Sequence, residues 1–110
     1  MKLASETIGD VEVVEVMVKN LDADSAKQFR AEMEERLKAG GKIVFDFAML
    51  EFIDSSGLGA ILSCLRQLNA AGGDLKLCSM SSPVRSMFEL VRMHRVIEIY
   101  ETRDEAVASH

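Results

Sequence analysis

The strongest constraint on the fold of this chain is a strand that leads through a polar turn into a helix, within residues 43–71. Residues 43–47 are mainly apolar and include β-branched and aromatic side chains, which is typical of a buried strand: Ile43, Val44, Phe45 and Phe47. After the turn, apolar side chains recur at helical spacing, at Leu58, Ile61, Leu62, Leu65 and Leu68. Such a stripe predicts an amphipathic helix that packs on the core. A buried strand joined to a helix in this way predicts an α/β fold.

The turn at residues 54–59, with the sequence DSSGLG, places two hydroxyl side chains at the start of the predicted helix. An N-cap residue needs a short side chain with an acceptor oxygen, and serine or aspartate supplies one. If one serine caps the helix, the other is free to face solvent at the positive end of the helix dipole, where a phosphate is stabilised. A glycine inside a helix costs roughly 1 kcal/mol relative to alanine. Gly57 and Gly59 therefore indicate that either the core or a partner protein comes close to the helix backbone.

The rest of the chain alternates strands and helices. The turn pair at residues 9–10 predicts a hairpin between strands at residues 2–8 and 11–18. Asp22, Asp24 or Ser25 is expected to cap a helix that ends near residue 39, before a pair of glycines. The remaining predicted elements are a strand at 75–78, a helix capped by Ser81 or Ser82 with Pro83 at its first position, a strand at 96–100, and a helix at 104–108 capped by Thr102.

This order of elements predicts a small mixed β-sheet in a single domain of residues 1–110. Strands joined through helices pair in parallel by right-handed crossovers, whereas the hairpin adds an antiparallel pair. Apolar and polar residues alternate in the later strands, so the helices are expected to pack mainly on one side. Glu12 and Glu15 lie on opposite faces of their strand, which predicts an edge or half-covered position. In the third helix we expect a buried face, with two neighbours partly exposed: Val84, Met87, Phe88 and Val91 inside, Leu90 and Met93 outside.

The composition is typical of a globular protein with an acidic surface. Thirteen basic and 18 acidic residues give a net charge of −5 without a basic patch, so we do not expect nucleic-acid binding. No apolar run approaches the ~20 residues of a membrane span, and the first residues do not resemble a signal peptide. We therefore expect a cytoplasmic protein with no direct membrane insertion. Cys64 and Cys78 fall at apolar positions, which predicts buried free thiols, and no metal-ligand spacing is present.

No pattern in the sequence predicts catalysis or a cofactor. A nucleophile elbow requires a glycine two residues before the serine, and Ile53 stands there before Ser55. A phosphate-binding loop requires a lysine after its last glycine, whereas Gly59 is followed by Ala60. His94 lies in a charged turn, where solvent exposure or capping is the expected role. We therefore expect a binding protein rather than an enzyme.

Two segments, FDF at residues 45–47 and LEFIDSSGLGAIL at residues 50–62, resemble the signature of STAS domains, and especially of the bacterial anti-sigma factor antagonists. The similarity extends to residues 20–22, 72–75 and 82–88, and so covers essentially the whole chain. The order of elements in that family is also the order that the residues predict by themselves. The resemblance implies a STAS fold and a regulatory switch.

The resemblance also implies roles for individual residues. In that family a serine kinase, which is itself the anti-sigma factor, phosphorylates the first serine of the D-S-S-G turn, here Ser55. The unphosphorylated antagonist binds the kinase and frees a sigma factor, the phosphorylated form is released, and a PP2C-type phosphatase resets it. Ser56 is then expected to cap the helix, with Asp54 on the docking surface. The other expected partner-binding residues are Asp22, Asp24, Ser25, Ile53, Gly57 and Leu58.

Two other functions fit the same residues. One is a STAS domain that acts without phosphorylation, as a scaffold or as an accessory subunit of a transporter complex. The other is a small-ligand or nucleotide-binding module that uses the start of the middle helix as an anion site. The sequence gives no indication of the oligomeric state.

Overall fold

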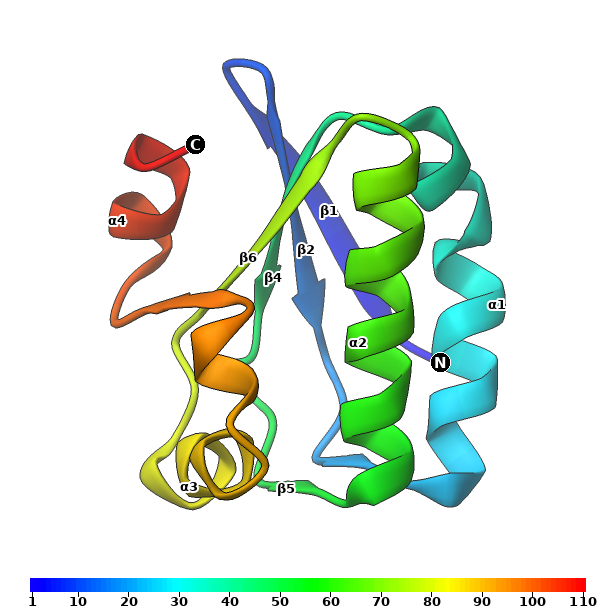
Figure 1. Cartoon of the computed structure of the whole chain (residues 1–110), viewed down its shortest axis with the longest axis vertical. Coiled ribbons are helices and arrows are strands. Elements are labelled where there is room, and N and C mark those ends of the chain that lie inside the picture. The colour runs from blue at the N-terminus through cyan, green and yellow to red at the C-terminus, as the bar shows by residue number, and fades with distance from the viewer.

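A five-stranded sheet runs through the middle of the molecule, in the order β1-β2-β4-β6-β7 (Figure 1). The computed structural model describes residues 1–110. β1 is antiparallel to β2, and every other neighbouring pair is parallel, as the hairpin and the helical crossovers predict. The mixed α/β fold is therefore confirmed. The strands are β1 Leu3–Ile8, β2 Val11–Val16, β4 Lys42–Asp46, β6 Asp74–Cys78 and β7 Glu98–Tyr100.

Two long helices cover one face of this sheet side by side, α1 Ala23–Ala39 and α2 Ser55–Ala70 (Figure 1). The shorter α3 Ser82–Leu90 closes one end of the sheet, and a 3₁₀ turn, η1 Met93–Arg95, follows it. The last helix, α4 Arg103–Ala108, lies on the opposite face against β4, β6 and β7. The helices thus pack mainly on one side, and α4 alone covers part of the other.

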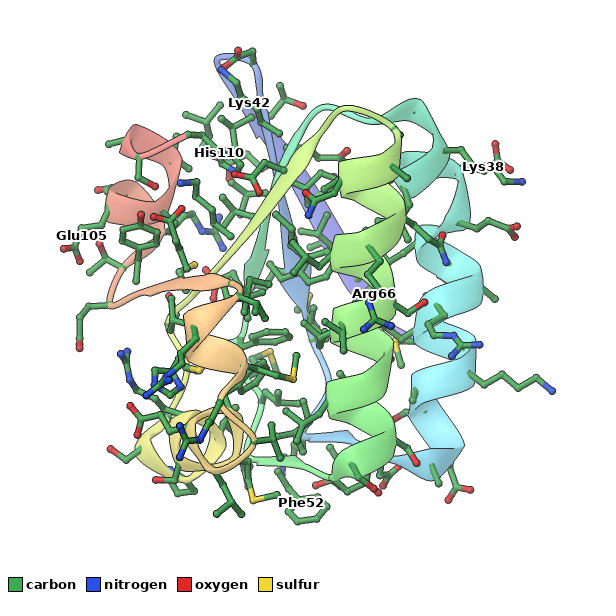
Figure 2. The ribbon with its side chains drawn as sticks, viewed as in Figure 1. Lys38, Lys42, Phe52, Arg66, Glu105 and His110 are labelled. Atoms are coloured by element: carbon green, nitrogen blue, oxygen red, sulfur yellow. The ribbon has the colours of Figure 1, made fainter.

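The core lies between the sheet and the two long helices (Figure 2). Phe29 of α1 packs edge-on against Phe45 of β4, with ring centroids 5.3 Å apart. On the opposite face, Ala106 of α4 closes a smaller apolar cluster. Cys64 and Cys78 are buried free thiols, as predicted. Burial raises the pKa of the Cys64 thiol to about 12 and that of the Cys78 thiol to about 11, so both remain protonated.

β2 is an internal strand, so of the two positions predicted from Glu12 and Glu15, an edge or a half-covered one, the edge position is wrong. Each carboxylate has an arginine partner on its own face of the sheet. Arg36 Nε of α1 lies 2.7 Å from Glu12 Oε2. On the other face, Arg103 Nη2 of α4 lies 3.7 Å from Glu15 Oε2 and 2.9 Å from Asp46 Oδ2. Paired charges let β2 take an internal place although neither face is wholly apolar.

A second, two-stranded sheet was not predicted. β3 Asn20–Leu21 pairs in parallel with β5 Phe52–Ile53, so that Leu21 stands opposite Ile53. These strands immediately precede α1 and α2, respectively. Their pairing therefore places the first turns of the two helices next to each other at one end of the molecule (Figure 1).

The end of α3 also differs from expectation. Val91, predicted to be buried, is 51% exposed, whereas Met93, predicted to be partly exposed, is buried. The helix stops at Leu90, and Arg92 adopts a left-handed conformation with φ 61°. This turn rotates the chain so that Met93 rather than Val91 faces the core. Leu90 is 75% exposed, as its position off the apolar stripe predicted.

Candidate partner-binding surface

Asp54 begins α2 and is its N-cap. Its backbone is extended, with φ −108° and ψ −173°, and its Oδ1 accepts a hydrogen bond from the Gly57 N–H at 3.0 Å. The expectation that Ser56 caps the helix is therefore wrong. The reason lies in β5: the Asp54 N–H donates to the Leu21 carbonyl at 3.2 Å, which holds Asp54 in the extended chain just before the helix.

Ser55 and Ser56 occupy the first two positions of α2, and both are exposed. Because Asp54 caps the helix, neither hydroxyl forms a hydrogen bond within the protein. The turn thus presents two uncommitted hydroxyls where one was expected, both at the positive end of the helix dipole.

The neighbouring start of α1 is built differently. Asp22 is the N-cap, and its Oδ1 accepts from the N–H groups of Asp24 at 3.1 Å and Ser25 at 3.2 Å. The Ser25 hydroxyl accepts in return from the Asp22 N–H at 3.0 Å, which completes a capping box. Of these predicted partner-binding residues, Asp24 is exposed, whereas Asp22 and Ser25 are partly buried and mutually bonded.

Three residues predicted to bind the partner lie beneath the surface. Ile53, Gly57 and Leu58 are all buried, and of the three only Leu58 reaches a surface depression, which is described below. The packing around Gly57 explains why this residue is a glycine. A Cβ at Gly57 would lie 2.2 Å from the Leu21 carbonyl oxygen and 2.7 Å from Ile53 Cγ1. Gly57 therefore allows β3 to run directly under the first turn of α2.

Next to Ser55 lies a shallow apolar depression that the sequence did not reveal. Two sides of it come from different elements, α2 on one side and the turn after α3 on the other. Its lining residues are Ser55, Leu58, Gly59, Leu62, Val91 and Met93. The only indication in the sequence was that two apolar residues, Leu90 and Met93, fall outside the apolar stripe of the third helix. Phe52, 51% exposed, is a further apolar side chain at this end of the molecule (Figure 2).

Away from this surface, the buried carboxylate of β4 is engaged in an ion pair, and no cluster of metal ligands is found. Asp46 is 4% exposed and bonds to Arg103 and to the Ala48 N–H, on the face of the sheet covered by α4. No group of three or more His, Cys, Asp or Glu side chains converges on a point that could hold a metal ion. None of the helices combines the length and the apolar character that crossing a membrane requires. What this end of the molecule offers is a surface of hydroxyl, carboxylate and apolar groups.

Known proteins are similar to this chain over most of its length. Residues 2–106 match the STAS domain family. An anti-sigma F factor antagonist from Paenibacillus polymyxa is 29% identical over 89 residues, which are 79% of this chain and 76% of the relative. The anti-sigma factor antagonist SpoIIAA in its unphosphorylated form has a TM-score of 0.77 and 28% identity, covering 96% of this chain and 93% of that one.

The phosphorylated form of SpoIIAA, a Bacillus cell fate determinant, has a similar backbone, with a TM-score of 0.71 and 26% identity over 98% of each chain. Both forms therefore share the arrangement of strands and helices seen in Figure 1. The sequence match, the order of the elements and the D-S-S-G turn at the start of α2 agree. Together they show that this protein belongs to the STAS domain family.

Proposed function

We propose that this chain is an anti-sigma factor antagonist in a partner-switching pathway. With Ser55 unmodified it binds an anti-sigma factor that is also a serine kinase, and phosphorylation of Ser55 releases it. The observation that carries the proposal is the exposed Ser55 hydroxyl, which has no hydrogen-bond partner and stands at the first position of α2. The named relatives support the class of partner, and the phosphorylated SpoIIAA structure supports the kind of modification.

The local structure tolerates a phosphate at Ser55. A phosphoserine carries about −1.5 to −2 charges at pH 7, and the N-terminus of α2 favours negative charge. The N-cap bond from Gly57 to Asp54 uses no atom of Ser55, so the modification leaves the cap in place. We therefore infer that the phosphate acts across the interface, by its bulk and by repulsion of acidic groups on the kinase, rather than by unfolding α2.

Ser55 is the better candidate of the two exposed serines because of its surroundings. Ser55 lines the apolar depression, together with Val91 and Leu62, whereas Ser56 does not. A partner seated on the depression therefore has Ser55 within its contact area. Asp24, exposed on the neighbouring start of α1, extends the same rim. In the cycle we propose, a PP2C-type phosphatase removes the phosphate and restores binding.

The test uses the kinase encoded in the gene neighbourhood of this chain. The two purified proteins are incubated with ATP, and the modified residue is mapped by mass spectrometry. We expect a single phosphate on Ser55, absent from Ser55→Ala and retained in Ser56→Ala, which is the matched control. Phosphate on Ser56, or undiminished labelling of Ser55→Ala, contradicts the assignment.

A binding measurement tests the switch itself. Isothermal titration of the kinase is expected to show that Ser55→Asp binds about a hundredfold more weakly than the unmodified chain, a loss of about 2.7 kcal/mol. Ser56→Asp carries the same charge one residue further on and is expected to lose much less. Equal binding by Ser55→Asp and the unmodified chain would instead favour the scaffold that acts without phosphorylation.

A further inference from the structure

No contact within the protein requires Gly59 to be a glycine. Unlike Gly57, it is exposed, and a Cβ placed on it would meet no atom within 4 Å. Glycine inside a helix is disfavoured relative to alanine, because it loses more backbone freedom on folding. The protein therefore carries a destabilising residue at a position where alanine would fit without a clash. Gly59 also lines the depression, so the missing side chain leaves that depression deeper.

Arg92, in the turn on the other side of the depression, shows the reverse case: a residue with a side chain stands where glycine is favoured. It follows α3 in a left-handed conformation, φ 61°, with its N–H bonded to the Glu89 carbonyl at 3.0 Å. Glycine is the residue that this position after a helix normally takes, since a Cβ is strained there. Its two neighbours, Val91 and Met93, both line the depression. Each side of the depression thus has, in its lining or next to it, a residue that a more stabilising one could replace: Gly59 in the lining and Arg92 between two lining residues.

Charge and polarity around the depression indicate what it accepts. The segment 90–96, LVRMHRV, contains two arginines and no carboxylate, in a chain whose net charge is −5. Neither Arg92 nor Arg95 forms an ion pair within the protein. Leu90 and Val96, 75% and 61% exposed, add apolar surface to the same segment. The depression is open, and no buried polar side chain is left unpaired in it to orient a small ligand.

We infer that the depression between α2 and the turn after α3 is the socket for an apolar side chain of the anti-sigma factor kinase, presented by an acidic segment that pairs with Arg92 and Arg95. This inference rests on the proposed function and names the surface that holds the partner beside Ser55. The absent side chain at Gly59 makes room for the anchor, and the basic segment selects acidic neighbours. Local violations of residue preference are expected at functional surfaces, because binding rather than stability retains them.

The experiment exploits the fact that stability and binding should change in opposite directions. Gly59→Ala is expected to raise Tm by about 4 °C while weakening kinase binding several-fold. Gly59→Leu fills the socket with a good helix former and is expected to keep the fold while weakening binding about 30-fold. Asn69→Leu, an exposed position on the last turn of α2, is the matched control and is expected to bind as the unmodified chain does.

Arg92→Gly tests the other side of the socket. It relieves the left-handed strain, so Tm is expected to rise, while binding at low salt falls about fivefold and the difference shrinks in 0.5 M NaCl. Unchanged kinase binding by Gly59→Leu overturns the inference, and unchanged binding by Arg92→Gly overturns the pairing of Arg92 with an acidic partner segment. A dimer of this chain, detected by analytical ultracentrifugation and dissolved by Gly59→Leu, also overturns it, because the occupant is then a second copy.

Ser55→Asp, measured in parallel, separates this inference from the proposed switch. If Ser55→Asp releases the kinase but Gly59→Leu does not, the switch stands and the socket is refuted. If Gly59→Leu releases the kinase and Ser55→Asp does not, the socket stands and phosphorylation at Ser55 is not the switch.

Discussion

The starts of α1 and α2 are neighbours that open with an aspartate N-cap, yet they use their serines in opposite ways. In α1 the serine at the third helical position, Ser25, returns a hydrogen bond to the cap residue Asp22. In α2 the third position is Gly57, and the serines stand at the first two positions, from which neither bonds to Asp54. A serine at the third helical position thus becomes part of the cap, whereas a serine at the first or second position keeps its hydroxyl available.

The comparison also explains why α2 has no capping box. A capping box needs a side chain at the third position, and any side chain there would strike the Leu21 carbonyl of β3. The close packing of β3 under α2 therefore removes the residue that would have completed the box. The stability of the α2 start comes instead from backbone pairing with β3, which leaves its hydroxyls free for other use.

The largest expected effect is that of Gly57→Ala. The new Cβ would lie 2.2 Å from the Leu21 oxygen, so β3 and α2 must separate, at a cost of about 3 kcal/mol. Urea denaturation followed by circular dichroism measures this loss. Gly59→Ala, in open space on the same helix, is the control and should gain about 1 kcal/mol. Equal effects of the two substitutions would mean that β3 does not restrict the start of α2.

Removal of the two cap aspartates should have unequal effects. Asp22→Ala deprives the Asp24 and Ser25 N–H groups of their acceptor and breaks the box, so we expect a loss of about 2 kcal/mol. Asp54→Ala frees only the Gly57 N–H and should cost about 1 kcal/mol. The same denaturation experiment ranks them. A larger loss for Asp54→Ala would refute the view that α2 depends mainly on its pairing with β3.

Substitutions of the serines test the same comparison and should change the free energy of unfolding by smaller amounts. Ser25→Ala loses the bond from the Asp22 N–H and the bond to the Asn20 carbonyl, each 3.0 Å long, and should cost about 1 kcal/mol. Ser55→Ala removes no bond, so its free energy of unfolding should stay within about 0.3 kcal/mol of the unmodified value. Replicate thermal melts resolve this difference. Destabilisation by Ser55→Ala comparable to that by Ser25→Ala would mean that the Ser55 hydroxyl is structurally engaged.

Much of this arrangement was predictable from the sequence, because long elements leave clear patterns. The apolar stripe that begins at Leu58 and the polar turn before it predicted α2 and an available hydroxyl near its start. The identity of the cap was not predictable, since aspartate and serine are equally good caps. Which residue becomes the cap depends on where β5 ends. That point is set by the backbone pairing of β5 with β3. Strands of two residues show no periodicity by which to find them.

The apolar depression beside Ser55 could not be predicted for a related reason. Its far side depends on Val91 facing solvent and Met93 facing the core, the reverse of what continued helical spacing predicts. The reversal arises at Arg92, a residue whose chemistry gives no hint of a left-handed conformation. Side-chain patterns predict regular elements well, but they do not predict where a helix stops when glycine is absent from its end.

A similarly small effect is expected on the stability of Ser55→Asp, and it is the one that joins the comparison to function. A carboxylate at the first position of α2 is favoured by the helix dipole and close to Asp54, so the net change should be below about 0.5 kcal/mol and should shrink in 0.5 M NaCl. Thermal melts at two salt concentrations measure it. A near-zero effect on folding, beside a hundredfold effect on kinase binding, is what a switch on a rigid surface requires. A loss of several kcal/mol would show instead that charge at Ser55 acts by unfolding the start of α2, which is then a folding switch rather than a docking one.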